Sequence, residues 1–301
     1  MTSRWSQRSP VIVHHMAALE GQPFPPNSLE AIKACLDAKA SFIEIDVTAL
    51  ADEDYLLVHD PILESETTGN GPVGTCTAEG ARTLCFKSGD GVFSVPLLSD
   101  VVTAFLEGSA TSRLQIDFKN MIPFDDDEPM HRLIKLIEPL GERVIVSTGA
   151  DWQLRRLRKL APWLDLGLDI HFYIDWDPRD GERSPDEYPR ARSAYAGYWD
   201  DHPIALERHW TTAEYLEDRC EMLLGLVPKV STFYISHYFL LASLNDGFNW
   251  AEKLHAAGIK LDAWTVDVGK NATAEDIQRL VASGVDQFTT NTPLALADLV
   301  I

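Results

Sequence analysis

The chain has 301 residues, of which 45% are hydrophobic and 24% are charged, as in an ordinary soluble globular protein. Its formal net charge of -20 at pH 7 argues against nucleic acid and stable membrane association, because both partners attract basic surfaces. We see no signal peptide and no apolar run near the roughly 20 residues of a membrane span. The four cysteines lack the C-x-x-C spacing of zinc and redox sites, so we expect a reduced, cytoplasmic chain.

Strand and helix patterns alternate along the whole chain. Eight principal strands are predicted, at 11–13, 42–47, 113–119, 143–147, 164–172, 229–235, 259–266 and 285–289. A helix is predicted after each, at 29–40, 96–106, about 129–140, 151–160, 211–224, 244–257, 274–283 and 293–301. This alternation predicts a parallel sheet, and eight units at this length favour a (β/α)8 TIM barrel over an open sheet.

One segment breaks this rhythm. Residues 175–210 are rich in Asp, Arg, Pro, Tyr and Trp and follow the fifth strand. Because long loops in compact domains are usually functional or mobile, we interpret this segment as an excursion from the barrel. We therefore expect one domain over residues 1–301, with the excursion inside it.

Two acidic residues stand out in the second strand. In Phe42-Ile43-Glu44-Ile45-Asp46-Val47, side chains alternate between the faces of a strand, which places Glu44 and Asp46 on the same side. Taken alone, an E-x-D pair is most simply explained as two acids on the solvent-exposed face of a strand. Neighbouring carboxylates repel each other, however, unless a cation or a shared proton relieves them.

Further polar side chains fall at the ends of nearby strands. They are His14 after the first strand, His59 after a short strand at 55–58, and Asp117 and Lys119 late in the third. In a TIM barrel, such positions lie at the active-site face. Three carboxylates suit a hard divalent cation such as Mg2+ or Ca2+, histidines transfer protons near neutral pH, and a lysine attracts an anion. The combination points to phosphoryl chemistry.

The order of these residues resembles the glycerophosphodiester phosphodiesterase family, whose motifs are H-R, P-E-N-T, E-x-D, H-D, E-x-K and W-T-V-N. The matching segments are His14-His15, Pro25-Pro26-Asn27-Ser28, Glu44-Ile45-Asp46, His59-Asp60, Asp117-Phe118-Lys119 and Trp264-Thr265-Val266-Asp267. Residues 284–293 are similar to the closing G-V-D-x-x-x-T-D-x-P pattern. The resemblance covers nearly the whole chain apart from 175–210.

The resemblance implies a role for each matched residue. These are metal ligands at Glu44, Asp46 and Asp117, a general acid–base pair at His14 and His59, a phosphate contact at Lys119 and an aromatic wall at Trp264. It also implies a mechanism in which a hydroxyl beside the phosphate attacks phosphorus. Water then opens the cyclic diester, leaving an alcohol and glycerol 3-phosphate.

Three positions depart from the family pattern. His15 stands where the family has Arg, and Pro26 where it has Glu, so a cation and an anion are lost together. We expect His15 to be a polar wall of the phosphate site or a hydrogen-bonded core residue. Asp117 replaces Glu, so direct contact with a metal requires the cation to shift or a water to bridge.

Two other interpretations remain open at this point. The changes at His15 and Pro26 also fit a catalytically silent barrel that binds a phosphorylated ligand. A phospholipase D-type enzyme acting on lysophospholipids would keep the barrel and the cation. We expect a small-molecule phosphodiester as the partner, and the sequence leaves open whether the chain forms a homodimer.

Overall fold

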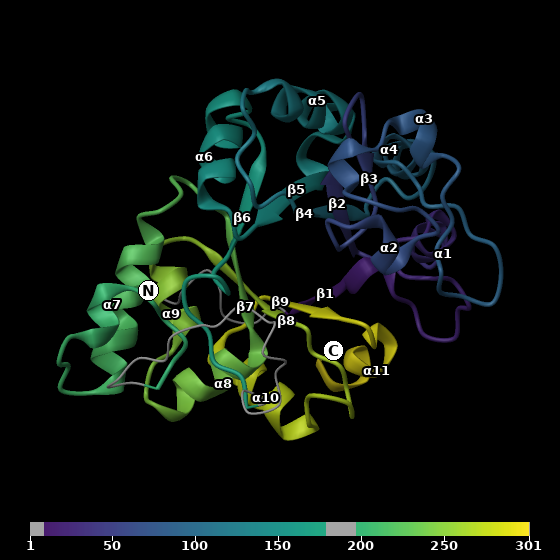
Figure 1. The fold of residues 1–301 in the computed structure, drawn as a ribbon. Coiled ribbons are helices and arrows are strands. Elements are labelled where there is room, and N and C mark those ends of the chain that lie inside the picture. The colour runs from purple at the N-terminus through teal and green to yellow at the C-terminus, as the bar shows by residue number, and fades with distance from the viewer. Residues whose placement is uncertain (1–8, 179–196, 301) are drawn as a thin grey trace.

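The computed structural model describes residues 9–178 and 197–300, and its parallel strands close into an eight-stranded barrel. Closure comes from β1, which pairs with β2 on one side and β9 on the other. Figure 1 shows β1, in purple, beside the yellow β9. The barrel strands are β1 (Val11–His14), β2 (Phe42–Ala49), β4 (Arg113–Phe118), β5 (Val144–Thr148), β6 (Asp165–Asp169), β7 (Thr232–Ser236), β8 (Lys260–Trp264) and β9 (Gln287–Thr290). The predicted (β/α)8 barrel is confirmed.

Helices surround the barrel in the order that the sequence predicts. They are α1 (Leu29–Asp37), α4 (Leu98–Glu107), α5 (Glu128–Ile137), α6 (Asp151–Leu160), α7 (Thr212–Leu224), α8 (His237–Asn245), α9 (Trp250–Ala256), α10 (Ala274–Ser283) and α11 (Pro293–Val300). Short 3-10 segments are η1 (His15–Ala17), η3 (Glu138–Arg143) and η4 (Pro203–Leu206). Apolar residues on the helices pack against the outward strand faces, as Ile32, Cys35 and Leu36 of α1 do in the main core.

Several predicted boundaries are wrong. The helix expected at 244–257 covers only the end of α8 and all of α9, because Gly247 has a positive φ of 85° and the side chain of Asn249 caps a new start at Trp250. The strand expected at 164–172 ends at Asp169. There the Asp169 carboxylate accepts a hydrogen bond from the backbone N–H of His171, which begins a turn instead of extending the strand.

The connection after β2 carries a small structure of its own. It contains β3 (Tyr55–Leu56), α2 (Leu63–Glu66), η2 (Val73–Thr75) and α3 (Ala78–Ala81). A separate buried cluster, which includes Leu63, Val73 and Phe86, packs beneath these elements. The strand predicted over 55–58 is shorter than expected, because Leu57 bonds to the carbonyl of Pro96 instead of continuing along β2. His59 therefore lies on a packed corner at the barrel mouth.

The excursion after β6 is anchored at both described ends. Asp175 and Trp199 exchange two backbone hydrogen bonds of 3.0 and 2.8 Å. Beyond them, the buried Arg219 of α7 forms an ion pair of 2.6 Å with Asp200. Residues 179–196 of the predicted excursion lie outside the described residues. Within the described parts of the chain, none of the helices has the length and apolarity needed to span a membrane.

Candidate functional site

Three carboxylates meet at the carboxyl end of β2 and β4. Asp46 and Asp117 are register partners on these neighbouring parallel strands, and Glu44 lies two residues before Asp46 on the same face. Glu44 and Asp46 are 2% and 1% exposed, whereas Asp117 is partly open to solvent. Each residue offers a carboxylate oxygen within 4.8 Å of the other two. The structure thus brings the three predicted ligands together.

Lys119 is the cation that this carboxylate cluster already contains. Its ammonium donates a 2.6 Å hydrogen bond to Asp117 and lies 3.0 Å from Asp46 Oδ1. Burial is the largest influence and would raise the pKa of Asp46. The positive charges of Lys119, His15 and His59, together with the hydrogen bond from Asn27, hold that pKa below its usual range. The two acids also raise the pKa of Lys119 against the effect of burial.

This lysine compensates the charge of Glu44 only in part. Burial, followed by repulsion from Asp46 and Asp117, raises the pKa of Glu44 well above the ordinary value. One positive charge is therefore too little for three closely spaced acids. A buried, oxygen-only donor set with surplus negative charge fits a hard divalent cation, which prefers carboxylate ligands. The chemistry of these three carboxylates therefore fits a metal site.

Two residues position the buried acids, and sequence reasoning assigned neither of them a role. Asn27 donates to Asp46 Oδ2 at 3.0 Å, while its own oxygen accepts from the Asp46 backbone N–H at 3.1 Å. The backbone N–H of Met16 donates to Glu44 Oε2 at 2.7 Å. Both residues have positive φ, 59° and 49°, an uncommon backbone conformation that clusters at functional sites. The Pro-Asn-Ser turn was the available sequence signal for Asn27.

His14 is buried where β1 ends. Its Nδ1 lies 2.8 Å from the carbonyl oxygen of Ala18. Because a carbonyl can only accept, Nδ1 carries the proton and Nε2 is left as the basic nitrogen. Burial lowers the pKa of His14, partly opposed by this hydrogen bond and by the charge of Glu20. The ring therefore stays neutral to lower pH than a free histidine and suits a general base.

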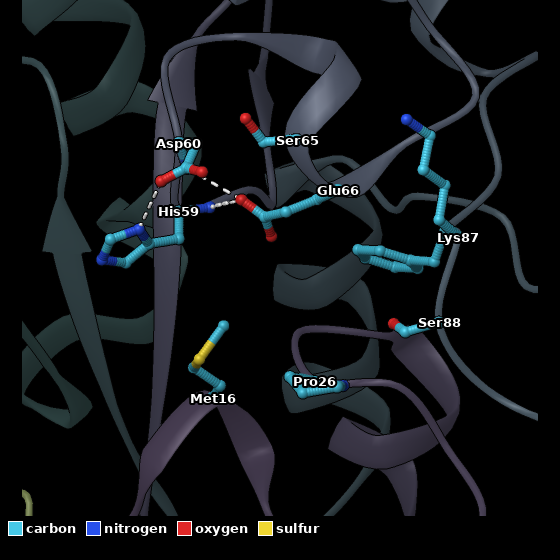
Figure 2. A pocket seen from close by; sticks show the side chains of 9 residues that line it. Met16, Pro26, His59, Asp60, Ser65, Glu66, Lys87 and Ser88 are labelled. Carbon is cyan, nitrogen blue, oxygen red and sulfur yellow. Dashed lines mark hydrogen bonds and ion pairs between the residues drawn. The ribbon is translucent and has the colours of Figure 1, made fainter. Parts of the chain in front are cut away.

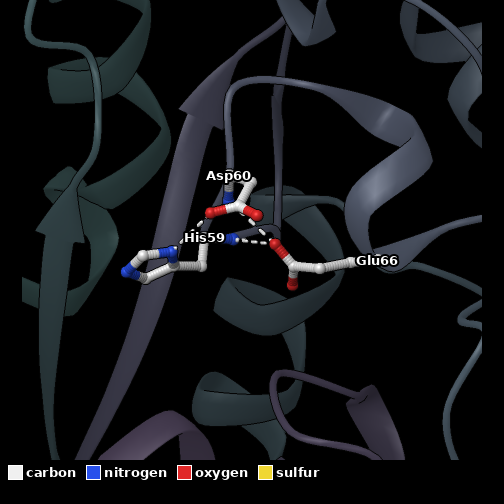
Figure 3. A group of neighbouring side chains, drawn as sticks. All are labelled: His59, Asp60 and Glu66. Atoms are coloured by element: carbon white, nitrogen blue, oxygen red, sulfur yellow. Dashed lines mark hydrogen bonds and ion pairs between the residues drawn. The ribbon is translucent and has the colours of Figure 1, made fainter. Parts of the chain in front are cut away.

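His59 belongs to an exposed corner with Asp60 and Glu66 (Figure 3). Its Nδ1 lies 2.9 Å from Asp60 Oδ1, an ion pair whenever the ring is protonated. Glu66 Oε1 accepts from the backbone N–H groups of both His59 and Asp60, at 2.9 and 2.8 Å. Burial raises the pKa of Glu66. The hydrogen bond to Glu66 holds the backbone of His59 in place. The contact with Asp60 uses Nδ1 of the ring and does not involve Nε2.

The remaining predicted site residues line the same mouth. His15 Nδ1 lies 2.9 Å from Asn291 Oδ1, and Asn291 in turn donates to Asp267. The charges of both His15 and His59 lower the pKa of Asp46, so both rings lie within electrostatic range of the carboxylate cluster. Trp264, at the end of β8, stands edge-on to His171 with ring centroids 5.4 Å apart. Its buried indole nitrogen has no hydrogen-bond partner among the described residues.

A fourth acid at the mouth was missed. Asp169 ends β6, and its charge interacts with those of Asp117 and Lys119. Burial raises its pKa to about 6, although the neighbouring His171 opposes the shift. The available sequence signal for Asp169 was its position at the end of the fifth strand. The prediction extended that strand to residue 172 and so concealed the signal. His237, which also follows a strand, is buried with ring nitrogens 3.3 and 3.2 Å from backbone carbonyls, a structural position.

A closed parallel barrel with acids, histidines and a lysine at its carboxyl-end mouth is suited to phosphoryl chemistry, and the comparisons with known proteins identify the class as phosphoric diester hydrolases. The family model described as "Glycerophosphoryl diester phosphodiesterase family" matches residues 20–295. The chain belongs to that family.

Individual relatives extend over almost the same length. A glycerophosphodiester phosphodiesterase from Caldanaerobacter subterraneus subsp. tengcongensis is 25% identical over 283 residues, 92% of each chain. A glycerophosphodiester phosphodiesterase structure from Parabacteroides distasonis has a TM-score of 0.65 and 15% identity over 98% of each chain. A phosphodiesterase from Oleispira antarctica, in complex with the product sn-glycerol-3-phosphate, has a TM-score of 0.63 and 15% identity, covering 97% of this chain and 96% of its own. At these identities the structures support the shared fold.

Proposed function

We propose that this protein hydrolyses glycerophosphodiesters to an alcohol and glycerol 3-phosphate, using a divalent cation and a pair of histidines. The observation that carries the proposal is the buried cluster of Glu44, Asp46 and Asp117 around Lys119. Family membership supports the reaction class. The relative crystallised with sn-glycerol-3-phosphate supports the identity of the product.

Glu44, Asp46 and Asp117 would hold the cation, either Mg2+ or Ca2+. When bound, it would supply positive charge to the phosphoryl oxygens and so stabilise the transition state. Asn27 and the Met16 N–H would keep the Asp46 and Glu44 carboxylates in place. Such supporting hydrogen bonds orient ligands and tune their basicity.

The two histidines would divide the proton transfers. His14 Nε2 removes the proton from the substrate hydroxyl beside the phosphate, and that oxygen forms the new bond to phosphorus. The bond to the leaving alcohol breaks, and His59 donates a proton to its oxygen. Water then opens the cyclic diester in a second displacement, with proton transfers in the reverse sense. The neutral, tethered ring of His14 favours the base role, and the carboxylate beside His59 favours the acid role.

Lys119 and His15 would contact the phosphate, and Trp264 would form the aromatic wall on the opposite strands. His15 can donate one hydrogen bond to the phosphate, whereas the family's Arg can donate two in a bidentate arrangement. We therefore expect weaker binding of the phosphate. The hydrogen bond that His15 Nδ1 donates to Asn291 Oδ1 fixes the orientation of the His15 ring.

A turnover assay with glycerophosphocholine and glycerophosphoethanolamine, coupled to detection of glycerol 3-phosphate, tests this proposal. We expect turnover that EDTA abolishes and that Mg2+ or Ca2+ restores. Full activity in chelator would refute the metal role. Absence of turnover with either cation, while glycerol 3-phosphate still binds, would instead support the catalytically silent barrel that the changes at His15 and Pro26 suggest.

A further inference from the structure

A cavity of about 380 Å3 opens directly beside His59. Its lining has an apolar side formed by Met16, Pro26 and Phe86 and an acidic side formed by Asp60 and Glu66. Figure 2 shows Met16 and Pro26 facing Glu66 across this space, with His59 at its edge. The volume is within the range of small-ligand sites.

The cavity and the carboxylate cluster are adjacent parts of one site. His59 lines the cavity, and its charge also acts on Asp46. Met16 likewise joins the two, because its side chain lines the cavity while its backbone N–H holds Glu44. A diester whose phosphate lies at the carboxylates therefore has its leaving oxygen near His59 and its alcohol in this cavity.

Glu66 has one oxygen engaged and one turned to the cavity. Oε1 accepts the two backbone hydrogen bonds from His59 and Asp60. Figure 2 shows the other oxygen pointing toward the space above Met16 and Pro26. The carboxylate is thus fixed in position by the chain before any ligand arrives, and little conformational freedom is lost when a ligand contacts it.

The charges around the cavity favour a positive ligand. Asp60 and Glu66 contribute two carboxylates, and Asp60 is paired with the His59 ring whenever that ring is protonated. Lys87 is the lysine of the lining, and no ion pair within the described residues joins it to the Glu66 carboxylate. The Lys87 ammonium donates to the backbone carbonyl of Glu64, which keeps it on the helix α2 side of the cavity. An aromatic ring and apolar walls beside a carboxylate suit an alkylated ammonium group, whereas a polyol needs many more hydrogen-bond partners.

We propose that this cavity receives the leaving alcohol and that Glu66 makes it selective for cationic amino alcohols over neutral polyols. This inference rests on the proposed function, because it assigns the alcohol released at His59. Glu66 determines specificity through the oxygen that points into the cavity. Its other oxygen, Oε1, holds the backbone of His59 and Asp60.

The first experiment compares kcat/KM for glycerophosphocholine and glycerophosphoglycerol. In Glu66→Gln the amide oxygen can still accept from the His59 and Asp60 N–H groups, but the negative charge is gone. We expect the ratio of the two kcat/KM values to favour choline in the wild type and to fall about three- to tenfold in the variant, the effect of losing one partly exposed ion pair. Glu64→Gln removes a charge from the same helix outside the cavity lining and should keep the wild-type ratio.

The second experiment needs no turnover. Choline chloride is titrated into protein carrying 13C-methyl methionine, and the NMR signal of Met16, identified by loss in Met16→Leu, is followed. We expect choline to shift this signal in the wild type and in Glu64→Gln, and glycerol at equal concentration to leave it in place. In Glu66→Gln the choline-induced shift should need about three- to tenfold more ligand.

The outcomes separate this inference from the proposed function. Turnover with a choline-to-glycerol ratio that Glu66→Gln leaves unchanged would overturn the inference and leave the function standing. Absence of turnover, with a Glu66-dependent choline shift at Met16, would overturn the function and support the cationic site. A shift with glycerol equal to that with choline would overturn the selectivity assigned to Glu66.

Discussion

Two groups of buried carboxylates in the barrel are neutralised in different ways. At the mouth, Glu44 and Asp46 lie beside Asp117 with the Lys119 ammonium between the strands. In the interior, Asp262 of β8 is fully buried. The hydrogen bonds that it accepts from described residues come from neutral groups, Thr289 at 3.0 Å and Gln287 at 3.3 Å. Burial raises the pKa of Asp262 to about 7, so near neutral pH a proton can cancel its charge.

The difference distinguishes a site from a structural acid. A single buried carboxyl can take up a proton and keep its neutral hydrogen bonds. Several carboxyls with a lysine hold a net negative charge that a proton only partly relieves, so the arrangement is suited to a divalent cation. We therefore expect changes at the mouth to affect catalysis and changes in the interior to affect stability.

The largest effect should come from Glu44→Gln at the mouth. Losing one of three negative ligands should reduce kcat/KM about a thousandfold while the protein remains folded. The coupled glycerol 3-phosphate assay measures the rate. Addition of Mg2+ or Ca2+ should raise the Tm of the wild type and of Asp262→Asn but not of Glu44→Gln. A Tm response in Glu44→Gln equal to that of the wild type would place the cation elsewhere.

The two histidines provide the next test, through the leaving group. His59→Ala and His14→Ala should each reduce hydrolysis of glycerophosphocholine about 10²- to 10⁴-fold. With a glycerophosphodiester of p-nitrophenol, whose anion leaves without a proton, His59→Ala should recover most of the loss and His14→Ala should not. Equal recovery in both variants would contradict the division of roles between them.

A smaller effect concerns the protonation of His14. Because burial lowers its pKa below the ordinary 6.5, the base form persists as pH falls. Its NMR titration, assigned by comparison with His14→Ala, should have a midpoint below about 6.5. The acid limb of kcat/KM at saturating cation should fall at the same pH, since protonation removes the base. A midpoint above 6.5 would argue against a buried, neutral ring.

The fold could be predicted from sequence because its signals are repeated along the chain. Helix α10 ends at the predicted Ser283, since Thr273 caps its start and Gly284 adopts a positive φ of 103° at its end. The split between α8 and α9 was missed because Leu244 and Trp250 continue an apolar pattern across the turn at Gly247. The residues of the turn itself, Asn245, Asp246 and Gly247, are exposed, so turn chemistry and not apolar periodicity was the available signal.

The site was predictable only where one short motif contains the chemistry. Glu44 and Asp46 share a strand face, so their proximity follows from alternation. Asn27 and Glu66 act through hydrogen bonds to backbone groups outside their own motifs, Asn27 at Asp46 and Glu66 at His59 and Asp60. Nothing local in the sequence encodes such contacts. Tertiary packing after β2 creates them, including the buried cluster beneath Glu66.

Asp262→Asn gives the smallest functional effect and completes the comparison. The folded-state pKa of Asp262, about 7, is above its ordinary value of 3.8, so the fold favours the protonated acid. Its contribution to stability is complete below pH 3.8 and is lost as pH rises toward 7. The wild type should therefore lose about 3 kcal/mol of unfolding free energy between pH 4 and pH 7 relative to Asp262→Asn. Urea unfolding at both values measures this difference, and kcat/KM of the variant should stay within about threefold of the wild type. If the unfolding free energies of both proteins changed in parallel with pH, Asp262 would ionise in the interior as it does in water. Proton uptake would then not distinguish Asp262 from the acids at the mouth.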